Sequence, residues 1–243
     1  MLIEKRFDTG TCELNYAEGP PAGLPLVLLH GGTSRWQAFF PVIPDLVAHW
    51  HIIAPDFRGH GRSDWVSGRY RLEDYVADTL ALLKQLRYPA VLVGHSLGGM
   101  VGLVVAARAP QSVRAVVVGD TPFSLTNLHD FIARTADEAA RRNQRAERPH
   151  DPDIHAALTA RFADTFAAWA AESILPAVQC PVLLLQADPT QGGLVTDEEV
   201  DGALPLLAGV QHRRFTGIDH GLFREPAVLQ VMSEFLTALP ALT

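Results

Sequence analysis

Short apolar runs of four to seven residues recur along the chain and are bounded by Gly, Pro or Asp. Runs of this length and setting favour buried strands of a parallel sheet over surface strands. They predict strands at 26–30, 51–55, 90–94, 113–119, 182–187 and 211–215. The stretches between them predict helices at 34–49, 72–87, 97–108, 196–207 and 227–239.

The first residues follow another pattern. Segments 2–7 and 12–17 flank a turn at 8–10 and predict a small hairpin. Beyond it, strands that alternate with helices indicate the α/β class: a mostly parallel, twisted sheet with helices on both faces. Right-handed crossovers then bring the loops that follow each strand to one rim, where open α/β sheets bind ligands.

One long segment interrupts the alternation. Residues 121–180 are rich in Ala and contain no run typical of a strand. We interpret them as a small helical lid inserted between residues 1–120 and 181–243, which together form the core domain. The alternative is two or three helices that simply pack on the sheet.

The composition of the chain disfavours several classes of function. The chain has 243 residues and a formal net charge of −7 with no basic stripe, which disfavours nucleic-acid binding. No apolar stretch is long enough to span a membrane, and no apolar leader segment is visible at the start, so we expect a cytoplasmic protein. Two cysteines, Cys12 and Cys180, indicate free thiols. No metal-ligand cluster and no nucleotide-binding glycine loop is evident, so we expect neither a metal nor another cofactor.

The strongest chemical signal is Gly94-His95-Ser96-Leu97-Gly98-Gly99, which follows a predicted strand and opens a predicted helix. A serine between two glycines in this setting is typical of a sharp strand-to-helix turn that exposes the hydroxyl. Side chains at positions 94 and 98 would collide there. The helix N-terminus points its free N–H groups at any negative charge that forms beside Ser96.

Four motifs in order resemble the α/β-hydrolase family over nearly the whole chain. They are His30-Gly31-Gly32, the loop Asp56-Phe57-Arg58-Gly59-His60-Gly61-Arg62-Ser63, the turn at 94–99, and Asp219-His220-Gly221. The resemblance implies an α/β-hydrolase fold with a serine nucleophile. It argues against the family branches whose nucleophile is Asp, such as epoxide hydrolases.

The same resemblance implies a catalytic triad. Ser96 would be the nucleophile and His220 the base, because His220 lies between the last predicted strand and the last helix. The family usually places the acid after the strand that follows the lid, which favours Asp188; Asp120, at the end of the strand 113–119, is the alternative. The backbone N–H groups of Gly32 and Leu97 would form the oxyanion hole.

Two further expectations concern the loops. We expect Asp56 and Arg58 to form a buried pair beneath the oxyanion loop, and the resemblance implies that His95 points away from Ser96.

The predicted function is hydrolysis of carboxylic esters of small to medium size through an acyl-enzyme. Lactone hydrolysis and cleavage of a carbon–carbon bond next to a carbonyl use the same groups and stay open. A hypothesis of a different class is a ligand-binding receptor that keeps the hydrolase fold. The expected partner is a small-molecule ester or lactone, and the sequence does not define an oligomeric state.

Overall fold

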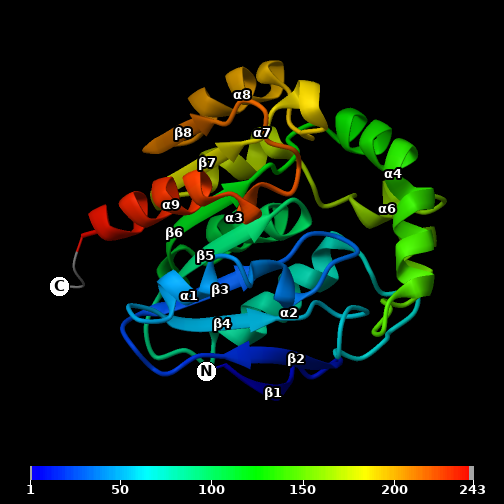
Figure 1. Cartoon of the computed structure of the whole chain (residues 1–243), viewed down its shortest axis with the longest axis horizontal. Helices are drawn as coiled ribbons and strands as arrows, with labels where there is room; N and C mark the ends of the chain where they lie inside the picture. Colours follow the sequence, from blue (N-terminus) through cyan, green and yellow to red (C-terminus); the bar gives the residue numbers. More distant parts are fainter. Residues whose placement is uncertain (1, 241–243) are drawn as a thin grey trace.

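An eight-stranded sheet runs through the centre of the protein, and the computed structural model describes residues 2–240 (Figure 1). The strands are β1 (Ile3–Asp8), β2 (Glu13–Glu18), β3 (Pro25–Leu29), β4 (His51–Pro55), β5 (Ala90–His95), β6 (Val113–Gly119), β7 (Val182–Gln186) and β8 (Val210–Arg214). Their order in the sheet is β1-β2-β4-β3-β5-β6-β7-β8. The first two pairings are antiparallel and the rest are parallel, so the predicted hairpin and parallel sheet are both present.

Helices cover both faces of the sheet, as the sequence predicts. They are α1 (Ile43–Leu46), α2 (Leu72–Leu83), α3 (Leu97–Arg108), α4 (Leu125–Arg145), α5 (Asp153–Leu158), α6 (Phe162–Thr165), α7 (Ala171–Ile174), α8 (Asp197–Ala203) and α9 (Pro226–Ala238). Successive residues of β3 point to opposite faces. Leu26 and Leu28 belong to a buried apolar cluster that includes residues of α1 and α9, whereas Val27 and Leu29 belong to a second cluster that includes residues of α2 and α3.

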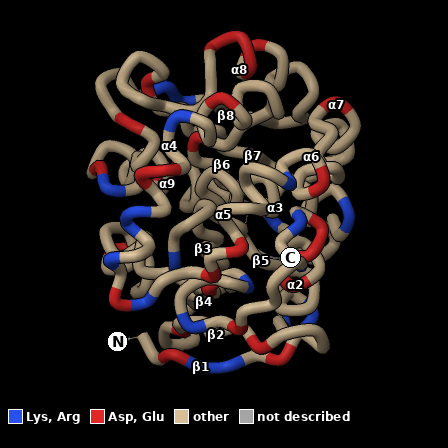
Figure 2. Tube along the Cα trace, turned by 90° about the vertical axis from the view of Figure 1, so that its right-hand side faces the viewer, with Lys and Arg blue, Asp and Glu red and all other residues tan. Residues whose placement is uncertain are grey.

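The central strands of the sheet carry few charged residues. Figure 2 shows Lys and Arg interspersed with Asp and Glu along the chain, while β3, β5 and β7 carry no charge. Strands that helices cover on both faces contain mostly apolar residues, because neither face of such a strand is in contact with water. Among residues 2–240, no helix is both long and apolar enough to cross a membrane.

One predicted helix differs from the observed structure. Residues 34–49 form a short 3-10 turn (Trp36–Phe39) and the four-residue helix α1 instead of one continuous helix. Pro41 and Pro44 explain the break, because each lacks an N–H and clashes with the preceding turn of a helix.

The segment between β6 and β7 contains α4 to α7 and no strand. It is tied to the sheet domain at its start and near its middle. Glu199 at the start of α8 accepts hydrogen bonds from the Phe123 and Ser124 amides, which precede α4. Further on, the Asp151 carboxylate accepts hydrogen bonds from the hydroxyls of Ser67 and Tyr70.

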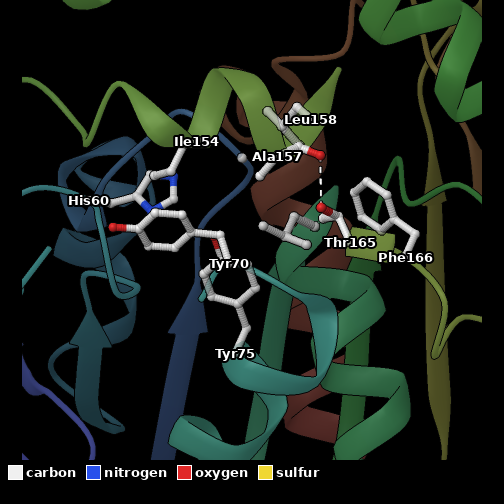
Figure 3. Close-up of a pocket in the computed structure, with 10 residues that line it drawn as sticks. His60, Tyr70, Tyr75, Ile154, Ala157, Leu158, Thr165 and Phe166 are labelled. Atoms are coloured by element: carbon white, nitrogen blue, oxygen red, sulfur yellow. Dashed lines mark hydrogen bonds between the residues drawn. The ribbon is translucent and has the colours of Figure 1, made fainter. Parts of the chain in front are cut away.

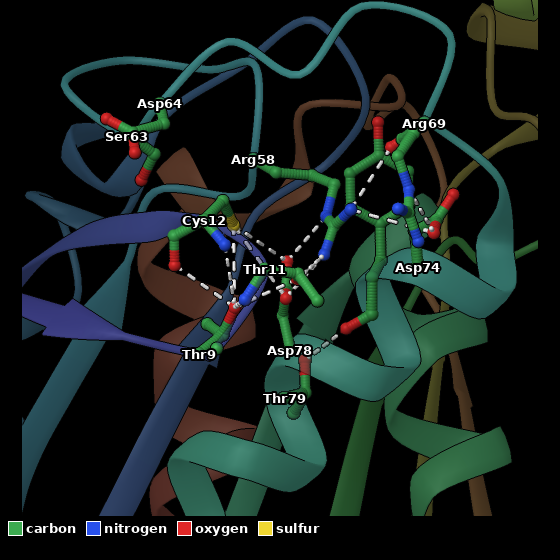
Figure 4. A network of polar contacts seen from close by, with 12 residues as sticks. Thr9, Thr11, Cys12, Arg58, Ser63, Asp64, Arg69, Asp74, Asp78 and Thr79 are labelled. Carbon is green, nitrogen blue, oxygen red and sulfur yellow. Dashed lines mark hydrogen bonds and ion pairs between the residues drawn. The ribbon is translucent and has the colours of Figure 1, made fainter.

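A buried polar network joins the hairpin to α2, and it corrects one expectation (Figure 4). Arg58 pairs with Asp78 of α2 through two nitrogens (2.6 and 2.7 Å), not with Asp56. Asp56 instead accepts hydrogen bonds from the Asn15 side chain and the Trp36 amide. The carboxylates of Asp56 and Asp78 thus accept hydrogen bonds from different parts of the chain. The spacing of residues in the sequence does not show which donor reaches which carboxylate.

Candidate active site

Ser96 sits at a strained turn between β5 and α3. Its φ of 52° lies in the left-handed region, which is rare for a residue other than glycine. The two flanking glycines make the turn possible. A Cβ on Gly94 would lie 2.3 Å from the Gly98 carbonyl oxygen, and one on Gly98 would lie 2.0 Å from the Leu29 carbonyl oxygen. The sequence prediction for this turn agrees with the structure.

His220 lies in the loop between β8 and α9 and is paired with Asp120. Its Nδ1–H donates to Asp120 Oδ2 over 2.7 Å. Since Nδ1 carries the proton, Nε2 is the basic atom, and it has no hydrogen-bond partner among residues 2–240. Asp120 therefore orients the imidazole in the way a triad acid does.

The Asp120 carboxylate is buried and held from several sides. It follows β6 directly and has a φ of 43°. Its oxygens accept hydrogen bonds from the amides of Leu194 (2.7 Å), Val195 (3.3 Å) and Ala187 (3.3 Å) in the loop after β7. These donors compensate the burial of the acid and fix its direction toward His220.

Asp188 is not at the imidazole, so its expected contact with His220 was wrong. Its carboxylate accepts hydrogen bonds from Thr190 and from the Gly217 amide (2.8 Å). The Gly217 amide is the main reason why the pKa of Asp188 is lowered. Asp188 thus braces the loop that carries His220. The signal for Asp120 was its position: β6 is the neighbour of β5, which carries Ser96.

The amides of Gly32 and Leu97 donate no hydrogen bond within the described chain. The two residues are neighbours, since a Cβ on Gly32 would lie 4.0 Å from Leu97 Cδ2. Leu97 opens α3, where the first N–H groups of a helix lack internal partners. Both amides are therefore free to stabilise an oxyanion.

Two buried histidines support the Gly32 loop. His30 Nδ1 donates to the Gly31 carbonyl (2.7 Å), and its Nε2 accepts from the Phe57 amide. His60 Nε2 accepts from the Thr33 amide (3.2 Å), and Nδ1 donates to the Arg58 carbonyl. Burial lowers the pKa of both rings, which keeps them neutral as this pattern requires.

The His95 side chain holds the loop of His220. Its Nε2–H donates to the His220 carbonyl oxygen over 2.7 Å, and the two rings lie 4.5 Å apart. Burial and the neighbouring His220 lower the pKa of His95 to about 3. The ring is neutral and acts as a fixed donor.

Ser96 and His220 line one cavity of about 610 Å³. Gly32 and Leu97 line it as well, and α4 forms much of the opposite wall. The ring of Phe131 from α4 lies 4.9 Å from His220. In the described residues, 2–240, Ser96 and His220 are not joined by a direct hydrogen bond. Hydrogen bonds between catalytic groups are often long before substrate binds.

A second, much smaller void lies behind Gly32 and Leu97. It measures about 10 Å³, the space of a single water, and its lining includes His60, Tyr70 and Phe166 (Figure 3). It is too small for a substrate chain, in contrast to the cavity that Ser96 and His220 line. Across residues 2–240, no group of three or more His, Cys, Asp or Glu side chains could hold a metal ion.

Comparisons with known proteins identify the family of the chain. The alpha/beta hydrolase fold family matches residues 25–173, more than half of the chain. The chain is 39% identical over 133 residues to 2-(acetamidomethylene)succinate hydrolase of Mesorhizobium japonicum, covering 54% of this chain and 48% of the relative. It is 39% identical over 102 residues to 2-hydroxy-6-oxo-2,4-heptadienoate hydrolase of Pseudomonas putida, covering 40% and 37%. These matched segments span less than half of either relative.

The crystal structure of an E-2-(acetamidomethylene)succinate hydrolase superposes with a TM-score of 0.82 at 27% identity, covering 98% of this chain and 100% of that one. The chain belongs to the alpha/beta hydrolase fold family. Curated proteins similar to parts of the chain are named as hydrolases and esterases.

Proposed function

We propose that the protein hydrolyses carboxylic esters of small to medium size through an acyl-enzyme on Ser96, with His220 as base and Asp120 as the triad acid. The contact of 2.7 Å between His220 and Asp120 is the observation that carries the proposal. It leaves Nε2 as a free base in the cavity that Ser96 also lines.

The reaction follows from these positions. Ser96 Oγ attacks the ester carbonyl carbon while His220 Nε2 takes its proton, and the electron pair of the carbonyl moves to oxygen. The amides of Gly32 and Leu97 stabilise that oxyanion. Its collapse breaks the ester bond, and the alcohol leaves with the proton from His220. Water then repeats the sequence on the acyl-enzyme, which frees the acid and restores Ser96.

The electrostatic part of this mechanism rests on backbone groups. One oxyanion donor typically contributes about 2.7–4 kcal/mol of transition-state stabilisation. A side-chain substitution cannot remove a backbone donor. In this proposal Gly32 and Leu97 therefore act through their backbone N–H groups and not through their side chains.

The cavity supports a small-molecule substrate. Its volume of about 610 Å³ lies within the range of sites for ligands of drug size. We propose that residues 121–180 act as its cap, because side chains of α4 and α5 line it opposite Ser96. A lactone is a cyclic ester and would react through the same steps.

A second candidate is cleavage of a carbon–carbon bond next to a carbonyl. The similarity to 2-hydroxy-6-oxo-2,4-heptadienoate hydrolase favours it, because the matched segment belongs to a protein named for that substrate. The same base and oxyanion hole would serve, with a carbon leaving group in place of an alcohol.

One substrate panel tests these readings. It contains p-nitrophenyl esters of rising acyl length, simple lactones, 2-hydroxy-6-oxo-2,4-heptadienoate and 2-(acetamidomethylene)succinate. We expect repeated turnover of short and medium esters that is lost in Ser96→Ala. Fast turnover of the dienoate with slow ester hydrolysis would favour the second candidate. A single slow burst with every compound would point to a receptor and contradict the proposal.

A further inference from the structure

His150 presents an unpaired imidazole to the catalytic cavity. The residue lies between α4 and α5 and is 7% exposed, and it lines the same cavity as Ser96. Its backbone is fixed on both sides by one residue: the Asn143 side chain donates to the His150 carbonyl (2.9 Å) and accepts from the His150 amide (2.7 Å). Position 150 is therefore held rigidly.

Neighbouring groups leave the His150 ring free. It lies against His60, with ring centroids 5.6 Å apart, on the side of the oxyanion loop. The adjacent carboxylate of Asp151 is engaged by Ser67 and Tyr70. In the part of the chain that the structure describes, neither ring nitrogen of His150 has a hydrogen-bond partner. Because His150 lines the cavity, a substrate group there can hydrogen-bond the ring.

The ring is neutral. Burial, with contributions from His30 and His155, lowers the pKa of His150 to about 4. A neutral imidazole offers one N–H donor and one lone pair, which matches a keto, amide or hydroxyl oxygen. A carboxylate fits less well, because it would lose its hydration beside an uncharged ring.

We propose that His150 is a specificity residue that hydrogen-bonds an uncharged oxygen group of the substrate, separate from the reacting carbonyl. The inference rests on the proposed ester hydrolysis for its substrate class. It predicts that the preferred esters carry a keto, amide or hydroxyl group a few bonds from the ester, on the acyl or the alcohol side. Pockets built to hydrogen-bond a substrate group discriminate against analogues without it.

Matched esters test this inference. Pentyl pentanoate is compared with pentyl 4-oxopentanoate, 4-oxopentyl pentanoate and the charged monopentyl ester of succinic acid, and kcat/KM is measured by titration of the released acid. We expect wild type to prefer a keto ester over the parent ester by roughly 3- to 10-fold, the range of one neutral hydrogen bond. His150→Phe keeps the ring contact with His60 and should abolish that ratio, while His150→Gln should restore part of it.

His155, which also lines the cavity and is half-buried, is the matched control. If His155→Phe rather than His150→Phe removes the keto preference, the assignment is wrong. A higher kcat/KM for the succinate ester would contradict the proposal that His150 binds an uncharged oxygen group. Equal kcat/KM values for all four esters would contradict the inference as a whole. Calorimetry of the same esters binding to Ser96→Ala separates the two proposals. If Ser96→Ala binds the keto esters more tightly but wild type hydrolyses none of the esters, only the esterase proposal is contradicted. If Ser96→Ala shows no preference for the keto esters, the role of His150 is contradicted.

Discussion

At His220, a single contact decides which of two carboxylates can orient the imidazole. Asp188 and Asp120 follow neighbouring strands, β7 and β6, and both end at the same rim. The local motif around Ser96 is defined by steric demands within a few residues. The choice of acid depends instead on which carboxylate the loops bring to the imidazole in space.

The two acids predict different kinetic effects. Asp120→Asn should lower kcat on the order of 10⁴-fold, because an amide no longer holds His220 in the required tautomer. Asp188→Asn should lower it by less than about 10-fold, since that side chain only braces the loop at Gly217. Steady-state kinetics on a p-nitrophenyl ester measures both. A larger loss in Asp188→Asn would return the role to Asp188.

The buried histidines predict a loss of stability on mild acidification. An unfolded histidine is protonated below about pH 6.5, whereas folded His95 stays neutral down to about pH 3. The unfolded state therefore binds more protons in this window, so the free energy of unfolding falls as the pH drops below about 6.5. Each such histidine contributes up to about 1.4 kcal/mol per pH unit.

Urea denaturation at pH 7.5, 6.0 and 5.0 measures this slope. The pKa values of His30 and His60 are lowered too, so the total slope includes their contributions. His95→Asn should show a shallower slope than wild type. An unfolding free energy that does not change over this range would contradict the neutral, buried state of these rings.

Among the helices, α3 is the one that the sequence predicts best. Its bounds agree with the expectation because a strand, two required glycines and a terminating Pro110 enclose it. The region 34–49 was harder, since its apolar spacing suggests a helix while its prolines divide it. The pairing of Arg58 with Asp78 was missed because Asp78 lies 20 residues further along the chain.

The turn at Ser96 makes a steric prediction with a control in the same helix. Gly98→Ala places a Cβ 2.0 Å from the Leu29 carbonyl oxygen, so we expect a loss of about 1–3 kcal/mol in the free energy of unfolding and a large loss of activity. In Gly102→Ala the nearest atom is a Val116 methyl at 3.4 Å, and the change should stay below about 1 kcal/mol. Equal stability of the two variants would contradict the tight turn.

At the scale of the whole molecule, the Arg58–Asp78 pair links the sheet rim to α2. Both side chains are almost fully buried, and Thr11 from the hairpin accepts a further hydrogen bond from Arg58 (2.9 Å). Removing one partner of a buried pair costs about 3–5 kcal/mol because it leaves an uncompensated charge.

Asp78→Ala should therefore lower the free energy of unfolding by about 3–5 kcal/mol. Asp164→Ala removes an exposed pair with Arg71 and should cost less than about 1 kcal/mol. Urea titration of both variants provides the comparison. Similar losses in the two would contradict the stabilising role of the buried network.

The fold as a whole was predictable because alternating strands and helices allow few topologies, and the family match confirms it. The cavity was not predictable from the sequence, because α4 and the loops that follow four different strands shape it. His150 shows why: nothing in its local sequence indicates that Asn143 fixes it beside the catalytic groups.

The most direct test of the proposed mechanism is labelling with a fluorophosphonate probe, followed by intact mass and peptide mapping. We expect one adduct, on the peptide that contains Ser96, and none in Ser96→Ala. The labelling rate should fall sharply in Asp120→Asn and remain near that of wild type in Asp188→Asn. Labelling that persists in Ser96→Ala would contradict the assignment of Ser96 as the nucleophile.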